Sequence, residues 1–399
     1  MPTAQLGQVP REAHRRCPCG ASRLDAAGGW SSEHDSGLSR SVVAAAGLDG
    51  IVGRASYDAA MTSETGLTSV EICAGAGGQA LGLEQAGFDH ALAVEIDPTA
   101  CDTLRANRPT WKVHEGDVRG VEGKAYDGID LLAGGVPCPP FSVAGKQLGA
   151  DDERDLFPEA LRLVREARPR AVMLENVKGL TYPRFANYRD QIRGALHEMG
   201  YGTHWQLIYS SEYGVPQLRP RFILVGLRPD DMARFEWPAP VGTPPTVGKT
   251  LHDLVAANGW TGADNWRDRR ANTVAPTIVG GSKKHGGADL GPSRAKASWA
   301  LMGVDGRGVA DPGDIPGEST APDALFRLTL RMGARVQGFP DSWEFTGRKT
   351  AAWRTVGNAF PPPVAFAVGS AIRRALTGES GNEATTAAPV VRNTSAIGR

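Results

Sequence analysis

Residues 68–86 read TSVEICAGAGGQALGLEQA, and this stretch decides how the rest of the chain is interpreted. Thr68–Ile72 is a short, mostly apolar run that predicts a β-strand, and it leads into the turn Ala74-Gly75-Ala76-Gly77-Gly78. A helix is expected next, over Gln79–Ala86. A strand that passes through a glycine-rich turn into a helix is how α/β sheets let backbone approach a nucleotide-like ligand.

The alternation of strands and helices continues along the chain. Further strands are expected at Ala91–Val94, Ile129–Leu132, Ala171–Leu174, Trp205–Tyr209 and Arg221–Val225, and further helices at Thr99–Ala106, Leu156–Ala167, Gln191–Met199, Leu330–Gln337 and Val364–Leu376. Such alternation requires crossover connections. We therefore expect a doubly wound α/β fold with a mainly parallel sheet, whose ligands lie at the carboxyl ends of the strands.

Composition divides the 399 residues into five segments. Residues 1–66 and 378–399 are small, polar and aperiodic, and we expect them to be disordered. Residues 67–227 and 327–377 are expected to form the two parts of the α/β domain. Residues 228–326 are rich in Pro and Gly, and helices are hard to place there, so we expect a smaller, loop-rich inserted domain.

The overall composition excludes several classes of protein. Hydrophobic residues make up 41% of the chain, which excludes a wholly disordered protein. No apolar run reaches the roughly 18 residues of a transmembrane helix, and the N-terminus lacks the apolar core of a secretory signal. Five scattered cysteines without a C-x-x-C pair argue against disulfides and metal sites. We expect a cytoplasmic protein without a metal; a translation start at Met61 is an open alternative.

Two acidic residues stand where predicted strands end. Glu95 closes the second strand, where its carboxylate could accept both hydroxyls of a ribose, and Asp117 follows the next apolar segment, where it suits an adenine amino group. The sequence contains no G-x-x-x-x-G-K-[ST] phosphate loop. These features favour a nucleoside-type cofactor, and helices capped by solvated acids are the alternative.

Cys138 lies in the loop Gly134–Ser142, which follows the third expected strand, and it stands between Pro137 and Pro139. Prolines on both sides stiffen the loop and hold the thiol in one direction at the carboxyl edge of the sheet, as a nucleophile requires. The alternative is a small buried side chain, and we favour that interpretation for Cys73 and Cys101, which lie in apolar strand and helix patterns.

A carboxylate and two guanidinium groups extend the candidate catalytic set. Glu175 comes straight after an apolar strand, where burial favours its protonated form and makes it a usable proton donor. The segment Gln217–Arg221 alternates, so Arg219 and Arg221 should share one face of an extended segment and suit a phosphate or a developing anion. A surface carboxylate and a solvated strand face are the alternatives.

In this order, these motifs resemble the cytosine-5 DNA methyltransferase family of the bacterial restriction-modification type. The matching segments are Glu71–Gly78, Pro137–Ser142, Gly145–Gln147, Arg154–Phe157, Glu175–Val177, Gln217 with Arg219 and Arg221, Arg335–Asp341 and Val356–Pro362. They cover about Thr68–Val225 and Phe326–Leu376. Several motifs in one order are far more specific than any one of them alone.

The resemblance implies S-adenosyl-L-methionine as cofactor and a flipped-out cytosine as substrate. The thiolate of Cys138 would add to C6 of the base, and Glu175 would hydrogen-bond or protonate N3. Asn176 would help fix the loop around the base, and Arg219 and Arg221 would hold the base and the loop.

The resemblance also implies the residues that contact the cofactor. These are Cys73, Ala74, Gly75, Gly77, Gly78, Glu95, Ile96, Asp117, Val118, Pro137, Leu156, Asn358 and Ala359. The chain departs from the family pattern at three of them: Cys73 stands where an aromatic residue is common, Ile96 where a larger ring often stacks on adenine, and Ala359 where Ser is frequent.

The inserted segment 228–326 resembles the family's target-recognition domain, which implies double-stranded DNA as partner. The formal net charge is zero, so any basic surface must be local; between residues 267 and 307, eight basic and three acidic residues leave an excess of five positive charges. We expect a monomer, with a restriction endonuclease that shares the target without binding the enzyme. A tRNA methyltransferase, a catalytically silent DNA-binding relative and a dehydrogenase are the alternatives, and the insert's size favours DNA over RNA.

Overall fold

A sheet of seven strands organises the protein. The computed structural model describes residues 66–137, 155–281 and 287–379. The strands are β1 (Leu67–Ile72), β2 (Phe88–Glu95), β3 (Val113–Glu115), β4 (Leu131–Gly135), β5 (Ala171–Val177), β6 (Gly202–Tyr209) and β7 (Pro220–Leu227). Their order is β3-β2-β1-β4-β5-β7-β6, in which β7 runs antiparallel to both neighbours and all other pairs are parallel. The predicted mainly parallel α/β sheet is confirmed.

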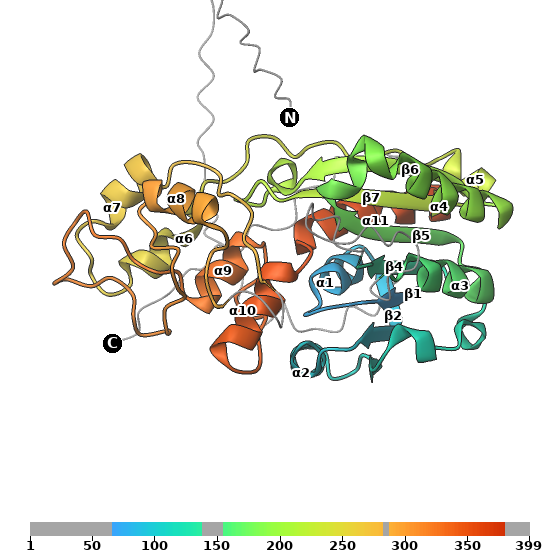
Figure 1. The fold of residues 1–399 in the computed structure, drawn as a ribbon, viewed down its shortest axis with the longest axis horizontal. Helices are drawn as coiled ribbons and strands as arrows, with labels where there is room; N and C mark the ends of the chain where they lie inside the picture. Colours follow the sequence, from blue (N-terminus) through green and yellow to red (C-terminus); the bar gives the residue numbers. More distant parts are fainter. Residues whose placement is uncertain (1–65, 138–154, 282–286, 380–399) are drawn as a thin grey trace, which may run out of the picture. The chain divides into compact units, whose positions relative to one another are not determined.

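Helices cover both faces of this sheet (Figure 1). One face packs against α1 (Gly78–Gln85), α2 (Pro98–Asn107) and α11 (Pro362–Thr377), and the other against α3 (Phe157–Ala167) and α4 (Ala186–Glu198). The short α5 (Pro229–Met232) follows β7. Shorter 3-10 turns lie at Val118–Gly120, Gly123–Tyr126, Lys178–Thr181, Pro183–Phe185 and Ser210–Tyr213.

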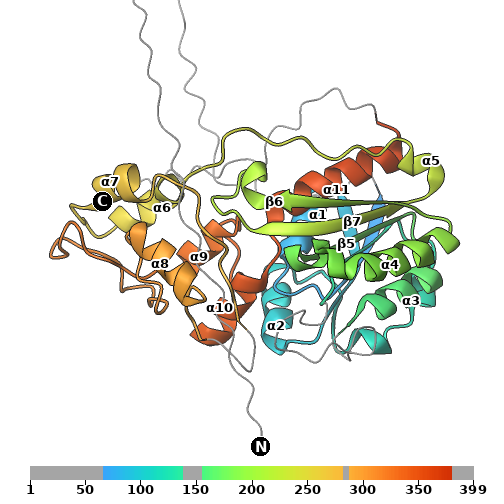
Figure 2. The ribbon, with the colours of Figure 1, turned by 45° about the horizontal axis from the view of Figure 1, so that its top comes forward.

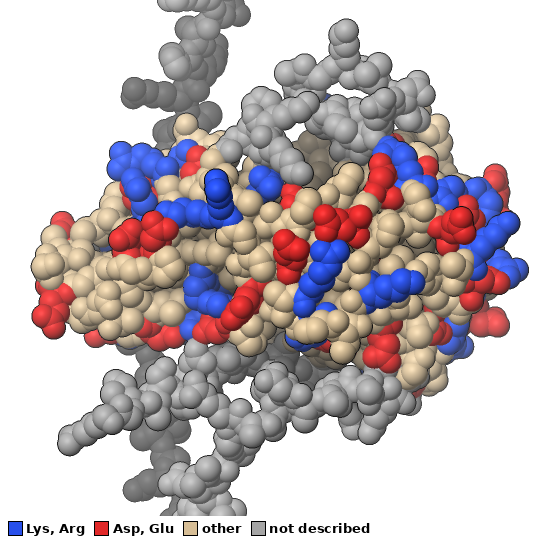
Figure 3. Space-filling view, turned by 90° about the horizontal axis from the view of Figure 1, so that it is seen from below, with Lys and Arg blue, Asp and Glu red and all other residues tan. Residues whose placement is uncertain are grey.

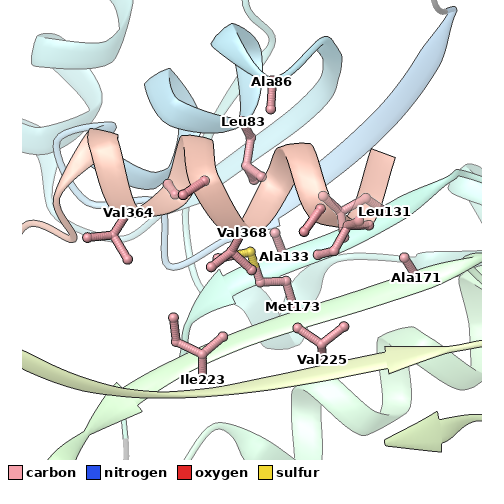
Figure 4. Packing of buried hydrophobic residues seen from close by; sticks show 14 of the residues in the cluster. Leu83, Ala86, Leu131, Ala133, Ala171, Met173, Ile223, Val225, Val364 and Val368 are labelled. Atoms are coloured by element: carbon pink, nitrogen blue, oxygen red, sulfur yellow. The ribbon is translucent and has the colours of Figure 1, made fainter. Parts of the chain in front are cut away.

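Alternation along the strands divides the sheet's side chains between two cores. In β5, Met173 points toward Val364 and Val368 of α11, as Figure 4 shows, whereas Val172 and Leu174 join the core under α3 and α4. Both faces of the strand are therefore buried. This explains why the central strands are continuous apolar runs in the sequence rather than alternating ones.

Elements α6 to α10 build a second lobe beside the sheet, and Figures 1 and 2 show α10 next to α2 where the two parts meet. The lobe contains α6 (Val247–Ala256), α7 (Ala263–Asn265), a π-helical turn (Trp266–Arg270), α8 (Ser293–Leu301), α9 (Leu330–Val336) and α10 (Lys349–Asn358). Its core holds the fully buried rings of Trp266, Trp299 and Trp353.

The inserted segment contains the helices α6, α7 and α8, which the sequence made hard to place. In α6, Val247, Leu251 and Val255 recur every four residues and form one buried stripe, and the hydroxyl of Thr246 caps the helix by accepting from the backbone N–H of Lys249. The dense Pro and Gly residues lie in the connections around these short helices.

Several element limits differ from the expected ones. The strand β5 runs on to Val177, so Glu175 and Asn176 lie within the strand and not after it. The three residues of β3 and the helix α10 were not expected, because the first is a short polar edge strand and the second lacks a clear apolar stripe. The limits of the inserted domain stay predictions, although Met332, Val336 and Trp353, beyond residue 326, belong to the second lobe's core.

No helix in the described part of the chain is long and apolar enough to span a membrane. The expectations for residues 1–65 and 380–399, including the possible start at Met61, lie outside the described residues.

Candidate active site

A cavity of about 540 Å³ lies along the carboxyl edge of the sheet. Most of the predicted site residues line it: Cys73, Ala74, Gly75, Glu95, Ile96, Asp117, Val118, Pro137, Leu156, Glu175, Asn358 and Ala359. The first ten come from the strands, from the loops that follow them or from the residue before α3, and Asn358 and Ala359 come from the end of α10. Residues almost 300 positions apart therefore meet at one edge.

The strand order sets the order of groups along this cavity. Asp117 follows β3, Glu95 ends β2, Cys73 follows β1, Pro137 follows β4 and Glu175 lies near the end of β5. Neighbouring strands are about 4.8 Å apart, so the cavity can hold an extended ligand laid across five strands.

Glu95 holds the glycine turn against the end of β2. Its Oε2 accepts the backbone N–H of Gly75 at 2.8 Å, and its Oε1 accepts the N–H groups of Ile96 and Asp97, both at 2.8 Å. A carboxylate has about four acceptor positions, so one remains for a ligand hydroxyl. Glu95 can therefore accept one hydrogen bond from a sugar hydroxyl, where the sequence analysis expected two.

At the end of the cavity beside β3, Arg119 holds the side chain of Asp117 in place. The backbone N–H of Arg119 donates to its Oδ1 at 2.9 Å and the Arg119 guanidinium lies 3.0 Å from Oδ2, and these contacts lower the pKa of Asp117. Ile96 is 64% exposed and lines the cavity beside it. A flat apolar ring could lie on such an exposed side chain.

Gly77 and Gly78 are not among the residues that line the cavity, and their predicted contact with the cofactor stays a prediction. A Cβ at Gly77 would lie 2.7 Å from side-chain atoms of Leu104 and Trp343, and one at Gly78 would lie 2.0 Å from the carbonyl oxygen of Phe360. These glycines are required because α1 packs tightly on α2 and on the C-terminal segment. Gly75, with φ +56°, lines the cavity as predicted.

Glu175 and Arg221 form a buried ion pair. Glu175 faces Ile223 in the antiparallel pairing of β5 with β7, so Arg221, two residues earlier, lies diagonally across on the same face. Its Nε is 2.5 Å from Oε1 of Glu175, and burial lowers the pKa of Arg221. A Cβ at Gly135 would lie 3.2 Å from Oε2 of Glu175. Glycine there leaves room beside that oxygen, on the lining of the cavity.

Asn176 points to the opposite face of β5 and holds the base of the predicted catalytic loop. Its Nδ2 donates to the carbonyl of Val136 at 2.8 Å, and its Oδ1 accepts the N–H of Val177. The N–H of Leu156 donates to the carbonyl of Pro137, which joins the two ends of the segment that contains Cys138. Cys138 and the motif residues up to Arg154 lie outside the described residues.

Arg219 does not share an extended face with Arg221. Its φ is +26°, which is not extended backbone, and its guanidinium is buried, donating to the carbonyls of Ile278 at 2.9 Å and Ala359 at 2.7 Å. Pro220 and the turn before β7 prevent the simple alternation that the sequence predicts. Arg219 therefore ties the sheet to the second lobe and the C-terminal segment.

The cavity includes polar residues that the sequence analysis did not select. Glu71 and Gln79 are 1% and 3% exposed, and Oε2 of Glu71 and both amide atoms of Gln79 have no hydrogen-bond partner among the described residues. Burial raises the pKa of Glu71 well above its ordinary value. Arg354 of α10 pairs with Asp97 at 3.1 Å on the lining. A polar residue directly before the apolar first half of the helix, Ala80–Leu83, was the available signal for Gln79.

Cys73 is a packed thiol rather than a reactive one. Burial, together with the nearby carboxylates of Glu95, Asp117 and Glu71, raises its pKa, and its φ is +53°. The thiolate is therefore disfavoured. Among the described residues no group of three or more His, Cys, Asp or Glu side chains could hold a metal ion.

The predicted basic excess of the second lobe is partly neutralised. Arg267 pairs with Asp264 and Asp268, Lys296 with Asp289, and Arg307 with Asp305. Asp264 lies just outside the range counted in the sequence. On the face shown in Figure 3, basic and acidic side chains are interspersed.

Two of the basic side chains counted between residues 267 and 307 remain available for phosphate groups. Arg269 and Arg294 are exposed and make no ion pair within the described part of the chain. Lys283 and Lys284 lie outside it.

Comparison with known proteins identifies a family model for residues 67–374, described as C-5 cytosine-specific DNA methylase. The Type II methyltransferase M.NaeI of Lentzea aerocolonigenes is 57% identical over 317 residues, covering 78% of this chain and 76% of that protein. M.NgoMIV of Neisseria gonorrhoeae is 53% identical over 319 residues, covering 78% and 99%.

Solved structures share the fold. A candidate DNA modification methyltransferase from a prophage of E. coli superposes with a TM-score of 0.55 at 22% identity, covering 78% of this chain and 99% of that one. A variant of Spodoptera frugiperda DNMT2 gives 0.54 at 16% identity, covering 77% and 99%.

Proposed function

The chain belongs to the C-5 cytosine-specific DNA methylase family, and from this premise we propose how its own residues methylate C5 of cytosine in a specific double-stranded DNA sequence. It is a DNA (cytosine-5-)-methyltransferase of the Type II restriction-modification kind, as its relatives above 50% identity are. The observation that carries the proposed residue roles is the cavity, because it joins acidic groups after β3 and β2 to Glu175 on β5 and to the base of the Cys138 loop.

S-adenosyl-L-methionine fits the groups that line the cavity. Glu95 would accept a ribose hydroxyl, Asp117 an adenine amine, and Ile96 would lie against the adenine ring. Pro137, Leu156 and Asn358 complete the lining. When bound, the cofactor supplies a methyl group made electrophilic by its sulfonium sulfur.

The base is activated by residues at the β4 and β5 end. The thiolate of Cys138 would add to C6 while the carboxyl group of Glu175 donates a proton to N3 and accepts a hydrogen bond from the exocyclic amine, so electron density would rise at C5. Arg221 orients the Glu175 carboxylate by pairing with its Oε1. C5 would take the methyl group as the bond between that carbon and the sulfonium sulfur breaks. The C5 proton would then pass to a water molecule, the bond from Sγ to C6 would break, and N3 would return its proton to Glu175, which restores the ring and the thiolate.

Labelled methyl transfer to unmethylated duplex DNA, with tRNA in parallel, tests the proposal. We expect label in DNA only, and bisulfite sequencing should place 5-methylcytosine in one recurring short sequence. Cys138→Ala should abolish transfer while retaining cofactor binding. Label in tRNA alone would move the substrate to RNA, and retained turnover by Cys138→Ala would contradict the nucleophile assignment.

We further propose that the methylation protects DNA from a restriction endonuclease with the same target. Methylated plasmid should resist that nuclease, whereas plasmid exposed to Cys138→Ala should be cut. The enzyme would act as a monomer in the cytoplasm, where its DNA substrate lies. Sedimentation of the purified protein tests the monomer, which a dimer at micromolar concentration would contradict.

A further inference from the structure

Gln79, the second residue of α1, is buried without a hydrogen-bond partner. Its side chain is 3% exposed and lines the cavity, yet neither Oε1 nor Nε2 is paired among the described residues. Buried amides are almost always hydrogen-bonded, because an unpaired one loses its interactions with water without replacement. The side chain is therefore a candidate for binding a ligand in the cavity.

The surroundings of Gln79 keep its amide in place. The preceding Gly78 packs directly against the carbonyl oxygen of Phe360, so the first turn of α1 has no room to shift toward the C-terminal segment. Glu71 on β1 lines the same cavity, and one of its carboxyl oxygens, Oε2, is also unpaired among the described residues. Together the two side chains offer both hydrogen-bond donors and acceptors at the β1 end.

The order of the strands shows which part of the cofactor lies there. The nucleoside groups Asp117 and Glu95 follow β3 and end β2, while the base-activating Glu175 belongs to β5. The sulfonium must lie between the nucleoside and the base. The remaining part, an α-amino acid with one carboxylate and one ammonium, then falls at β1 and the start of α1.

We propose that Gln79 binds the amino-acid end of S-adenosylmethionine, its Nε2 donating to the carboxylate and its Oε1 accepting from the ammonium. A primary amide matches this ligand because it carries a donor and an acceptor on one planar group. The assignment rests on the proposed function, since it takes the cofactor from it. Gln79 is then a binding residue for the cofactor and touches no atom of the DNA.

Calorimetry with two ligands tests this directly. S-adenosylhomocysteine carries the amino-acid end, whereas 5′-methylthioadenosine has the same nucleoside and a thioether but lacks it. Gln79→Met keeps the length of the side chain without its amide. We expect this substitution to lower the affinity for S-adenosylhomocysteine about 10- to 100-fold, which corresponds to the loss of one or two hydrogen bonds to charged groups. The affinity for methylthioadenosine should stay within about threefold of the wild-type value.

Asp117→Asn, at the opposite end of the cavity, is the matched control and should lower the affinities for both ligands by a similar factor. Unchanged binding of S-adenosylhomocysteine to Gln79→Met, or an equal loss of both ligands, would overturn the assignment. Because the substitution removes an unpaired buried amide, the melting temperature of the ligand-free variant should equal or exceed that of the wild type.

Two further measurements keep the test decisive. If Gln79→Met does not fold, the wild type alone decides: it should bind S-adenosylhomocysteine at least about tenfold more tightly than methylthioadenosine, and equal affinities would overturn the inference. A wild type that binds S-adenosylhomocysteine but methylates no DNA would refute the proposed function and leave the role of Gln79 standing.

Discussion

At the residue scale, burial decides what each polar side chain can do. Glu175 and Arg221 are paired on one sheet face, with one oxygen of Glu175 left beside Gly135. Arg219, two residues from Arg221, is buried between backbone carbonyls and links three segments of the chain. Neighbours in the sequence therefore have different tasks, one beside the cavity and one in the framework.

Arg219→Ala should destabilise the protein by about 3 kcal/mol, because it leaves the carbonyls of Ile278 and Ala359 unpaired and opens a cavity. Urea unfolding of the ligand-free protein measures this loss. Arg193→Ala is the control: Arg193 is exposed in α4, and its pair with Asp190 should contribute less than about 0.5 kcal/mol. Equal stability of the two variants would show that Arg219 is not a structural link.

Glu71 should make the stability of the ligand-free protein fall as the pH rises. Its folded pKa lies well above the ordinary value of 4.5 because of burial. Below pH 4.5 the group is protonated in both states; above it the unfolded chain ionises first, so unfolding is increasingly favoured until the folded pKa is passed. Glu71→Gln should remove this decline in unfolding free energies measured between pH 5 and 9. Parallel pH profiles for both proteins would contradict it.

At the scale of elements, close packing fixes α1 between α2 and the C-terminal segment. Gly78 in the first turn of α1 leaves no room for a side chain against Phe360. The end of α10 that lines the cavity directly precedes Phe360. The positions of α1 and of the cavity wall are therefore coupled through one contact.

Gly78→Ala should lower the melting temperature and the affinity for S-adenosylhomocysteine. The new Cβ would lie 2.0 Å from the carbonyl oxygen of Phe360 and must displace the backbone around Phe360. A loss of about 1–3 kcal/mol is expected from overpacking. Gly194→Ala, in α4 with nothing within 4 Å of its Cβ, should instead stabilise by about 0.5–1 kcal/mol. Thermal unfolding and calorimetry compare the two, and an unaffected Gly78→Ala variant would contradict the coupling.

At the scale of the whole molecule, the two lobes are joined by buried polar contacts. Gln217 accepts the N–H of Ile278 at 2.6 Å and donates to Gln337 at 2.8 Å, beside the Arg219 link. In the second lobe, residues before and after position 326 share one core. A replacement of residues 228–326 must therefore keep side chains that pack against the core residues beyond position 326.

A chimera that takes residues 228–326 from a family member with another target should change the methylated sequence but lose stability, because Met332, Val336 and Trp353 would face foreign partners. Replacing these three side chains by the donor's should restore the melting temperature and keep the new target. Thermal unfolding and bisulfite sequencing measure the two effects. An unchanged methylated sequence in a folded chimera would refute the recognition role of the segment.

Local sequence patterns were sufficient to predict the sheet, the family and most of the residues that line the cavity. Apolar runs that alternate with helical patterns predict a doubly wound α/β sheet. The motifs around Gly75, Glu95 and Glu175 are local patterns that can be recognised without the three-dimensional structure. Such local signals suffice because a strand's carboxyl end and the turn after it are adjacent in the chain.

The contacts between residues far apart in the sequence could not be predicted and were found in the folded chain. It placed Arg219 under Ile278 and Ala359, packed Gly78 against Phe360, and left the amide of Gln79 unpaired in the cavity. It also paired Arg267 with Asp264 and so reduced the basic excess counted along the sequence. Burial and hydrogen-bond pairing depend on segments up to hundreds of residues away, and no local pattern carries that information.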